Sequence, residues 1–288
     1  MDPILLDLGF LVVYKYSLMI FLAALIGGSI ILLESKRFKI SEDYMLNLFF
    51  FLLPLAGIGA RLYYVAFNWD YYSQNIVSIF KIWEGGMSFH GGLVGVITTI
   101  FLWCRYHKKS FFQIADLFAM AAPIGLFLGR IANFINGELY GRPTLSSLGI
   151  IFPNTDGLPR HPSQLYEAFG EGLILFLILF IIHKFKAVKN RYGTTAFAFV
   201  GLYGIARIII ENFREPDAQI GFLKFGITMG QLLTIPMILA SITAIIYLSK
   251  KKQAIQKYVS SPFLENQSIK TRFFTRQNGV SSGVFASA

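Results

Sequence analysis

The 288-residue chain has few charged side chains and a single cysteine. Asp, Glu, Lys and Arg make up 15% of it and hydrophobic residues 55%, whereas a typical soluble domain is about 25% charged. That balance argues against a soluble globular protein and for a chain whose solvent is lipid. The lone Cys104 excludes an intramolecular disulfide framework and any metal site built from several cysteines. The first residues lack the pattern of a removable signal peptide, so we expect the first helix to stay in the protein.

Several apolar segments approach the ~20 residues that a helix needs to cross the hydrocarbon layer of a membrane. The third is short and glycine-rich, which is typical of a tilted or partly re-entrant segment. The sequence therefore predicts an all-α polytopic membrane protein with about seven transmembrane helices in a domain over residues 1–250. The segments lie near residues 14–33, 46–67, 90–104, 111–128, 165–182, 194–213 and 228–248.

Lys and Arg gather in particular loops, and cytoplasmic loops of membrane proteins carry the excess of these residues. The enriched loops are the first, third and fifth, and further lysines follow the last segment. We therefore predict an outer N-terminus, a cytoplasmic C-terminus, and outer loops near residues 68–89, 129–164 and 214–227. Topology explains most of the net charge of +10, which gives no indication of nucleic-acid binding. The polar, basic residues 251–288 are predicted to be a mostly disordered cytoplasmic tail.

The predicted outer side contains the unusual polar residues. Residues 129–142 read GRIANFINGELYGR, in which Arg130, Asn133 and Asn136 recur at intervals of three and Glu138 follows. If the helix continues, these side chains lie along one stripe. One interpretation is structural, because an arginine at the bilayer boundary can snorkel to headgroups and asparagines can bridge helices. The other is functional, because a guanidinium flanked by amides is suited to binding two phosphate oxygens.

A second polar set lies in the sixth apolar segment. Tyr203, Arg207, Glu211 and Arg214 follow one another at spacings of four, four and three, so all four share one helical face. A pair between Arg207 and Glu211 would make this polar helix tolerable in lipid. Such a pair is compatible with function, since a glutamate can hold an arginine in place for a ligand.

His90 lies at the outer entrance of the third segment, within the stretch GGMSFHGG at 85–92. The four glycines permit close approach of the backbone to a ligand or a neighbouring helix. Lone histidines are more often structural than catalytic, yet imidazole, with a pKa near ~6.5, can accept a proton near neutral pH. The stretch LPRHPSQLYE at 158–167 is equally polar, but Pro162 at a helix start and Ser163 as its cap explain much of it locally.

These stretches resemble the prolipoprotein diacylglyceryl transferase family. The family motif is Gly-Arg-x-(Gly or Ala)-Asn-Phe-apolar-Asn-x-Glu-x-x-Gly, and residues 129–141 satisfy every position, with Ala132 in the small-residue place. The resemblance covers roughly residues 14–248 and leaves the polar tail outside it. Further similarity lies in GGMSFHGG at 85–92, KSFFQIADL at 109–117, RHPSQLYE at 160–167 and REPDAQ at 214–219.

The resemblance implies an enzyme of the bacterial inner membrane with its active site toward the outer leaflet or the periplasm. It implies transfer of the sn-1,2-diacylglyceryl group of phosphatidylglycerol to the lipobox cysteine thiol of a prolipoprotein, which gives a thioether and glycerol phosphate without a metal or cofactor. The catalytic residues implied are His90, which would help to activate the thiol, and Arg130 and Arg207, which would surround the phosphate. The substrate-binding residues implied are Arg130, Asn133, Asn136, Glu138, Tyr203, Glu211, Arg61 and Tyr16.

Two stretches depart from the family pattern. Around Tyr16 the chain reads YKYSLM, where family members commonly have a tryptophan or histidine before the tyrosine and a glycine after it. The outer stretch from 143 to 158 is short for the soluble cap of many members, which allows recognition of the protein substrate to differ in detail.

The chemistry agrees with these residues independently of the resemblance. A thiol with a pKa near ~8.5 is mostly protonated at neutral pH, so its attack requires a base or a lowered pKa of the thiol, and a departing phosphate requires positive charge nearby. Cys104 is not expected to be a nucleophile, because the charge pattern places it at the cytoplasmic end of its segment. A transporter or channel for an anionic lipid or solute would also use embedded arginines, but the sequence shows no inverted repeat to favour it.

Overall fold

The computed structural model describes residues 4–9, 12–153, 155–185, 188, 191–216, 221, 223 and 226–250. Residues Met1–Lys251 form one compact unit. The tail predicted at 251–288 lies outside the described residues, as do residues 217–219 of the REPDAQ stretch.

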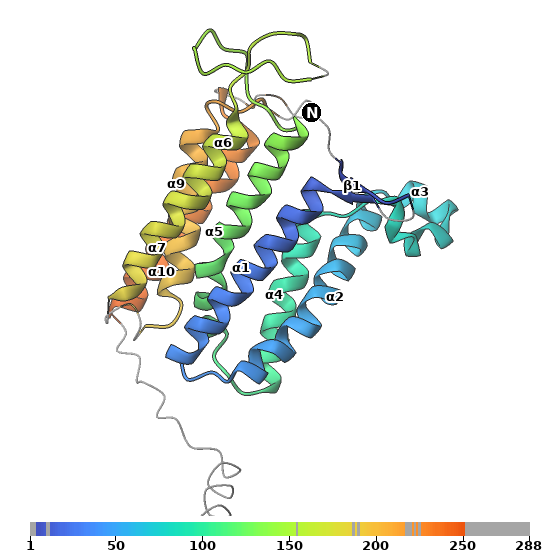
Figure 1. Cartoon of the computed structure of the whole chain (residues 1–288). Coiled ribbons are helices and arrows are strands. Elements are labelled where there is room, and N and C mark those ends of the chain that lie inside the picture. The colour runs from blue at the N-terminus through green and yellow to red at the C-terminus, as the bar shows by residue number, and fades with distance from the viewer. Residues whose placement is uncertain are drawn as a thin grey trace, which may run out of the picture. The chain divides into compact units, whose positions relative to one another are not determined.

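The described part of the chain is an α-helical bundle with a small β-hairpin, formed by β1 (Ile4–Asp7) and β2 (Val12–Tyr14) (Figure 1). Short helices α3 (Trp69–Gln74), η1 (Ile76–Phe80) and η2 (Ile82–Glu84) form a side arm after the second long helix. The long helices are α1 (Lys15–Arg37), α2 (Glu42–Phe67), α4 (Phe89–Tyr106), α5 (Phe111–Asn136), the successive α6 (Ser163–Glu167), η3 (Ala168–Ile174) and α7 (Leu175–Lys184), then α9 (Thr194–Ile210) and α10 (Met229–Lys250).

The length and composition of these helices confirm the predicted all-α polytopic membrane protein. Five described helices can cross a membrane by these criteria, namely α1, α2, α5, the helix over Ser163–Lys184, and α10. α9 is a shorter apolar helix. Large apolar side chains such as Phe50 and Leu53 are 73% and 66% exposed on the helix flanks, as expected where lipid covers them. A helix occupies each apolar segment, and the number that cross the bilayer and their orientation stay predictions.

α4 contains the glycine-rich third segment and packs closely on α2. The glycine-rich third segment is a continuous helix of 18 residues, and whether it is tilted or partly re-entrant in the membrane stays a prediction. Its glycines bring it close to α2: a Cβ on Gly59 would lie 2.6 Å from the oxygen of Gly91, and a Cβ on Gly95 would lie 2.8 Å from the oxygen of Leu55. Gly91 and Gly95 are four residues apart, the spacing that lets membrane helices pack backbone to backbone. These glycines therefore serve helix packing.

α5 lies between two groups of helices, with α1, α2 and α4 on one side and α6–α7, α9 and α10 on the other (Figure 1). An apolar core fills each side of it. Asp116 of α5 accepts hydrogen bonds of 2.8 Å from the backbone N–H groups of Gly193 and Ala196, so it caps the start of α9 and fixes that helix against α5. The two cores include Met45, Leu48, Ile114 and Leu117 on one side and Met120, Leu175, Leu179 and Ala198 on the other.

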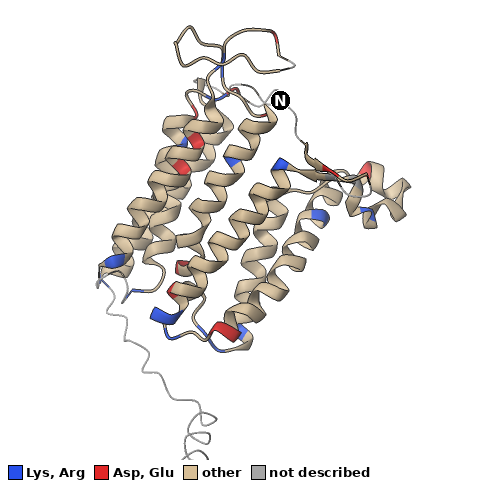
Figure 2. Cartoon of the chain, viewed as in Figure 1, with Lys and Arg blue, Asp and Glu red and all other residues tan. Residues whose placement is uncertain are grey.

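Charged residues lie mostly at the helix ends, and the middle of the bundle is largely without them (Figure 2). The C-terminal ends of α1, α4 and α7 lie at one end of the bundle, and those of α2, α5 and α9 at the other, as the predicted topology requires (Figure 1). Within the helices near this second end, basic and acidic residues come together on α5, α6–η3 and α9 (Figure 2). This group is the candidate site.

Candidate active site

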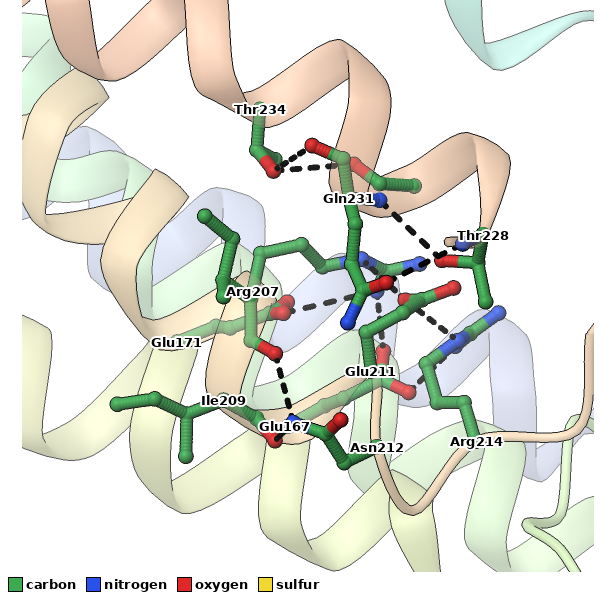
Figure 3. Close-up of polar contacts among 12 residues, drawn as sticks. Glu167, Glu171, Arg207, Ile209, Glu211, Asn212, Arg214, Thr228, Gln231 and Thr234 are labelled. Carbon is green, nitrogen blue, oxygen red and sulfur yellow. Dashed lines mark hydrogen bonds and ion pairs between the residues drawn. The ribbon is translucent and has the colours of Figure 1, made fainter. Parts of the chain in front are cut away.

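The carboxylate of Glu167, at the end of α6, is the centre of the site. It is fully buried. Arg130 of α5 places its Nε 2.7 Å from Glu167 Oε2, and Arg207 of α9 places its Nη1 3.2 Å from the same oxygen. Arg214, just after α9, donates through Nη1 to the other oxygen (Figure 3). Arginines from distant parts of the chain therefore meet at one carboxylate.

Two further carboxylates complete this set of charges (Figure 3). Arg207 Nε lies 3.1 Å from Glu211 Oε2, which confirms the pair predicted from their spacing. Glu211 Oε2 also lies 3.5 Å from Arg214 Nε, and Glu171 Oε1 lies 3.5 Å from Arg207 Nη1. We call the following residues the Arg–Glu cluster: Arg130, Arg207, Arg214, Glu167, Glu171 and Glu211.

The arginines of the Arg–Glu cluster keep partial access to their surroundings, whereas its central carboxylates do not. The Arg130 side chain is 20% exposed and the Arg207 side chain 14%, against 0% for Glu167 and Glu171. Buried charges are costly unless they are paired and hydrogen-bonded, so each of these groups depends on its partners within the cluster. A ligand that enters the site meets guanidinium groups first.

The helix over Ser163–Lys184 places the two fully buried glutamates. Glu167 and Glu171 are four residues apart and project from the same side of it. The π-helical turn η3 begins directly after Glu167 and packs on α5. Gly172 permits this approach, because a Cβ there would lie 2.6 Å from Phe127 Cβ. π turns interrupt α-helices rarely and often at functional sites.

The first turn of α10 closes the Arg–Glu cluster on the Glu211 side (Figure 3). The backbone N–H of Gln231 donates to Thr228 Oγ1 over 3.2 Å, and the backbone N–H of Thr228 donates to Gln231 Oε1 over 3.1 Å. This reciprocal capping fixes the helix start. It sets Gly230 against Glu211, where a Cβ would lie 2.8 Å from the carboxyl carbon. The positive end of the helix dipole near this carboxylate is favourable.

The polar stripe predicted at the end of α5 forms a chain of contacts. Arg130 Nη1 lies 3.5 Å from Asn133 Oδ1, and Asn133 Nδ2 donates to Glu138 Oε1 over 2.8 Å. Asn136 Nδ2 also donates to Glu138 Oε1, over 3.3 Å. Glu138 is exposed. The chain of contacts therefore runs from the Arg–Glu cluster to the surface.

The turn after α5 is held by the stretch at 158–167. Gln164 Nε2 donates to the Glu138 carbonyl over 2.6 Å, and Ser163 Oγ donates to the Leu139 carbonyl over 3.1 Å. The sequence suggested that Ser163 caps its own helix, and the structure corrects this. Pro162 is the residue before the helix, and the Ser163 hydroxyl instead donates to Leu139. Leu139 has a φ of +57°, which few non-glycine residues adopt, and these bonds hold it there.

Two arginines of the loop between α5 and α6 contact the segment that follows α9. Arg142 Nε donates to the carbonyl of Arg214 over 2.6 Å, and Arg142 Nη2 donates to that of Glu211 over 3.3 Å. Arg160 Nη2 lies 2.8 Å from Asp156 Oδ2, and this hydrogen-bonded pairing holds the pKa of Asp156 below its ordinary value. Arg142 therefore holds the backbone of two residues of the Arg–Glu cluster, and Arg160 Nη1 lies 2.6 Å from Glu215 Oε2, beside Arg214.

Three of the predicted residues lie apart from the Arg–Glu cluster. Within the described ranges no hydrogen bond or ion pair joins Tyr16, Arg61 or His90 to it. His90 is exposed in the first turn of α4, and its ring centroid lies 5.7 Å from that of Phe89 and 6.4 Å from that of Tyr63. Tyr16 is 40% exposed in the first turn of α1.

Arg61 of α2 is buried and holds the side arm. Its Nε donates to the Ile79 carbonyl over 2.9 Å, its Nη2 to the Ser78 carbonyl over 2.5 Å, and its Nη1 to the Gly85 carbonyl over 2.5 Å. These bonds fix the segment that leads into α4 and His90. Arg61 therefore holds the backbone of the side arm next to His90 and does not contact the Arg–Glu cluster among the described residues.

Reasoning from the sequence does not single out Glu167, Glu171 or Gly230 as site residues. The available signal is the pair of acidic residues four apart at the start of an apolar segment, since ionisable residues inside a membrane are functional candidates by default.

Tyr203 lies one turn before Arg207 and stacks on Phe199, with ring centroids 6.1 Å apart. In the part of the chain that the structure describes, no three His, Cys, Asp or Glu side chains are placed to hold a metal ion.

Comparison with known proteins shows the family of this chain. A family profile described as prolipoprotein diacylglyceryl transferase matches residues 3–247. Phosphatidylglycerol–prolipoprotein diacylglyceryl transferase of Rickettsia felis is 48% identical over 242 residues, which cover 83% of this chain and 93% of that protein. The enzymes of the same name from Rhodospirillum rubrum and Azospirillum brasilense are each 45% identical, over 87% and 88% of this chain and 93% and 97% of their own lengths. The chain therefore belongs to the prolipoprotein diacylglyceryl transferase family.

Proposed function

We propose that this protein transfers the sn-1,2-diacylglyceryl group of phosphatidylglycerol to the lipobox cysteine thiol of prolipoproteins. The products are a thioether-linked lipid on the protein and glycerol phosphate. The observation that carries the proposal is the Arg–Glu cluster, which gathers three guanidinium groups at one end of a membrane bundle. The names of the relatives support both substrates, phosphatidylglycerol and the prolipoprotein.

In the reaction the thiolate attacks the glyceryl carbon that carries the phosphate, the C–O bond breaks, and the electron pair leaves with the phosphate. Negative charge therefore grows on the departing group, and guanidiniums that are already in place stabilise it more in the transition state than before. Arg130 suits this role because Glu167 contacts its Nε, while its Nη1 makes only a 3.5 Å contact with Asn133 among the described residues. Arg207 is held by three carboxylates and adds positive charge beside it.

His90 is assigned to the thiol rather than to the phosphate. Its ring is exposed at the start of α4 and contacts aromatic rings, while the arginines lie on α5 and α9. A neutral imidazole can accept the proton of a thiol that is mostly protonated at neutral pH. The site then has two halves, one for the anionic phosphate and one for the nucleophile, and the substrates would join them. Asn133, Asn136 and Glu138 would line the phosphate half together with Tyr203 and Glu211.

We propose that the Arg–Glu cluster faces the outer leaflet of the bacterial inner membrane. The basic loops that favour the cytoplasm follow α1, α4 and α7, and the cluster lies toward the opposite end of the bundle. A transporter for an anionic lipid or solute is not supported, since the relatives are named as transferases.

The proposal is tested with purified protein, phosphatidylglycerol and a peptide that contains a lipobox cysteine. The peptide mass should rise by one diacylglyceryl group, and glycerol phosphate should appear in equal amount. A matched peptide with serine in place of the cysteine should stay unmodified, because its hydroxyl is a far weaker nucleophile than a thiolate. An unmodified cysteine peptide in the presence of folded protein and lipid would contradict the proposal.

A further inference from the structure

The Arg–Glu cluster is balanced in charge before any ligand enters it. Three arginines face three glutamates, and none of the six side chains is more than 20% exposed. In such an environment an uncompensated charge is far more costly than at a surface. The phosphodiester of phosphatidylglycerol adds one negative charge. Binding therefore has to be accompanied by a compensating change in charge.

The three carboxylates are held unequally. Glu167 contacts all three guanidiniums, and Glu211 contacts two of them and lies against the first turn of α10. Glu171 is contacted by Arg207 alone, over 3.5 Å, and neither of its oxygens accepts a hydrogen bond from a described residue. With 0% exposure it also lacks hydration by bulk water that would stabilise its charge. Glu171 is therefore the carboxylate whose negative charge is least stabilised.

Charged and titratable groups face Glu171 from each neighbouring element. Arg207 and Tyr203 face it from α9, Arg130 from α5, Glu167 from α6, and Arg214 from the segment after α9. The three arginines favour its ionised form, and Glu167 and the approach of a further anion oppose it. An anionic headgroup that draws the guanidiniums toward itself thus removes the support that keeps Glu171 ionised.

We propose that Glu171 takes up a proton from water when the anionic headgroup of phosphatidylglycerol enters the Arg–Glu cluster. The inference rests on the proposed function, because it takes phosphatidylglycerol as the ligand. Protonation restores the charge balance and leaves Glu167 as the remaining carboxylate partner of Arg207 Nη1, so that more of the positive charge of Arg207 is available to the phosphate. Glu171 is in this role a positioning residue, which acts through Arg207 and does not itself touch the substrate.

The test measures protons taken up on binding. Phosphatidylglycerol is titrated calorimetrically into the protein in detergent, in two buffers of different ionisation enthalpy. The wild type should take up about one proton per lipid at a pH where free Glu171 is ionised. Glu171→Gln mimics the protonated side chain, so it should bind the lipid without proton uptake. At higher pH the lipid affinity of the wild type should fall by about tenfold per pH unit, whereas the affinity of Glu171→Gln should not change with pH in this way.

Three controls keep the result specific. Glu34→Gln alters another buried carboxylate, on α1 outside the Arg–Glu cluster, and should take up a proton like the wild type. Diacylglycerol, which lacks the phosphate, should bind without proton uptake. His90→Gln should leave the proton uptake in place, and loss of uptake in this variant with retention in Glu171→Gln would assign the proton to His90 and overturn the inference.

The wild type and the His90→Gln variant still test the inference if the Glu171→Gln variant fails to fold. Proton uptake with phosphatidylglycerol and none with diacylglycerol supports the inference, and lipid binding without proton uptake overturns it. Peptide transfer measured on the same preparation separates the two proposals, because transfer without proton uptake refutes only the role of Glu171. Absence of both transfer and lipid binding would overturn the proposed function as well.

Discussion

Replacement of Arg130 by lysine separates charge from geometry at the most exposed guanidinium of the Arg–Glu cluster. Arg130 contacts Glu167 Oε2 through Nε at 2.7 Å, and its Nη1 makes only a 3.5 Å contact with Asn133 among the described residues. The planar fork can therefore hold Glu167 on one edge and a phosphate on the other. A lysine ammonium is one point of charge, so it serves either Glu167 or the phosphate well, but not both.

The size of the effect follows from these contacts. Loss of one oriented donor to a developing oxyanion costs about 2.7–4 kcal/mol, which corresponds to about 10²–10³-fold in turnover. Glu167 keeps Arg207 and Arg214 as partners in the variant. Folding therefore loses at most one charge-assisted hydrogen bond, about 1.5–3 kcal/mol, and the ammonium restores part of it. Turnover should fall much more than stability or lipid binding.

Three measurements on one preparation check this prediction: peptide transfer at saturating lipid, phosphatidylglycerol binding, and thermal unfolding in detergent. Arg37→Lys is the matched control, since Arg37 pairs with Glu34 at the far end of α1 and its side chain is 55% exposed. Near-normal transfer by Arg130→Lys would show that Arg130 merely reaches the headgroups. Equal losses of binding and turnover would mean that Arg130 contributes uniform binding and no selective stabilisation of the transition state.

The remaining predictions concern stability, catalysis and topology. Glu167→Gln removes the common partner of three buried guanidiniums and should lower stability by about 3–5 kcal/mol, seen as a loss of thermal stability or of folded protein. Gly230→Ala places a Cβ 2.8 Å from the carboxyl carbon of Glu211, so it should displace this carboxylate from Arg207 and lower transfer without altering secondary structure by circular dichroism. His90→Ala should reduce transfer by about 10²–10⁴-fold at neutral pH and recover in part as pH rises, whereas a pH-independent loss would indicate substrate positioning. Single cysteines at Leu145 and Tyr106, which are 105% and 81% exposed, should react with thiol reagents from opposite sides of the membrane in a Cys104→Ser background, and labelling from one side would refute the topology.

The spacing of residues in the sequence predicted the contacts of the site that join side chains on the same helix. The spacing of four between Arg207 and Glu211 predicts their pair, which the structure contains at 3.1 Å. The spacing of three from Arg130 likewise predicts a continuous stripe through Asn133, and the structure joins the two side chains. In both cases helical geometry alone fixes which side chains meet.

The rest depends on contacts between distant segments. In the sequence, Glu167 belongs to a polar stretch whose proline and serine are explained by the start of a helix. Only the packing of α6 against α5 and α9 makes Glu167 the partner of three arginines. Gly230 gains its role from the capped turn that sets it against a carboxylate, a contact without sequence periodicity. Arg61 shows the same limit, because its partners are backbone carbonyls of a side arm whose irregular path no hydrophobic pattern predicts.

The bond that breaks in the lipid tests the central claim most directly, since the Arg–Glu cluster is proposed to stabilise a departing phosphate. Phosphatidylglycerol that carries ¹⁸O in the bridge between the glyceryl carbon and phosphorus is incubated with the protein and a lipobox peptide. Cleavage of the C–O bond by the thiolate leaves the label in glycerol phosphate and forms an unlabelled thioether peptide, as the account predicts. Label retained on a diacylglycerol product, with the peptide unmodified, would mean that the P–O bond breaks instead and would contradict it.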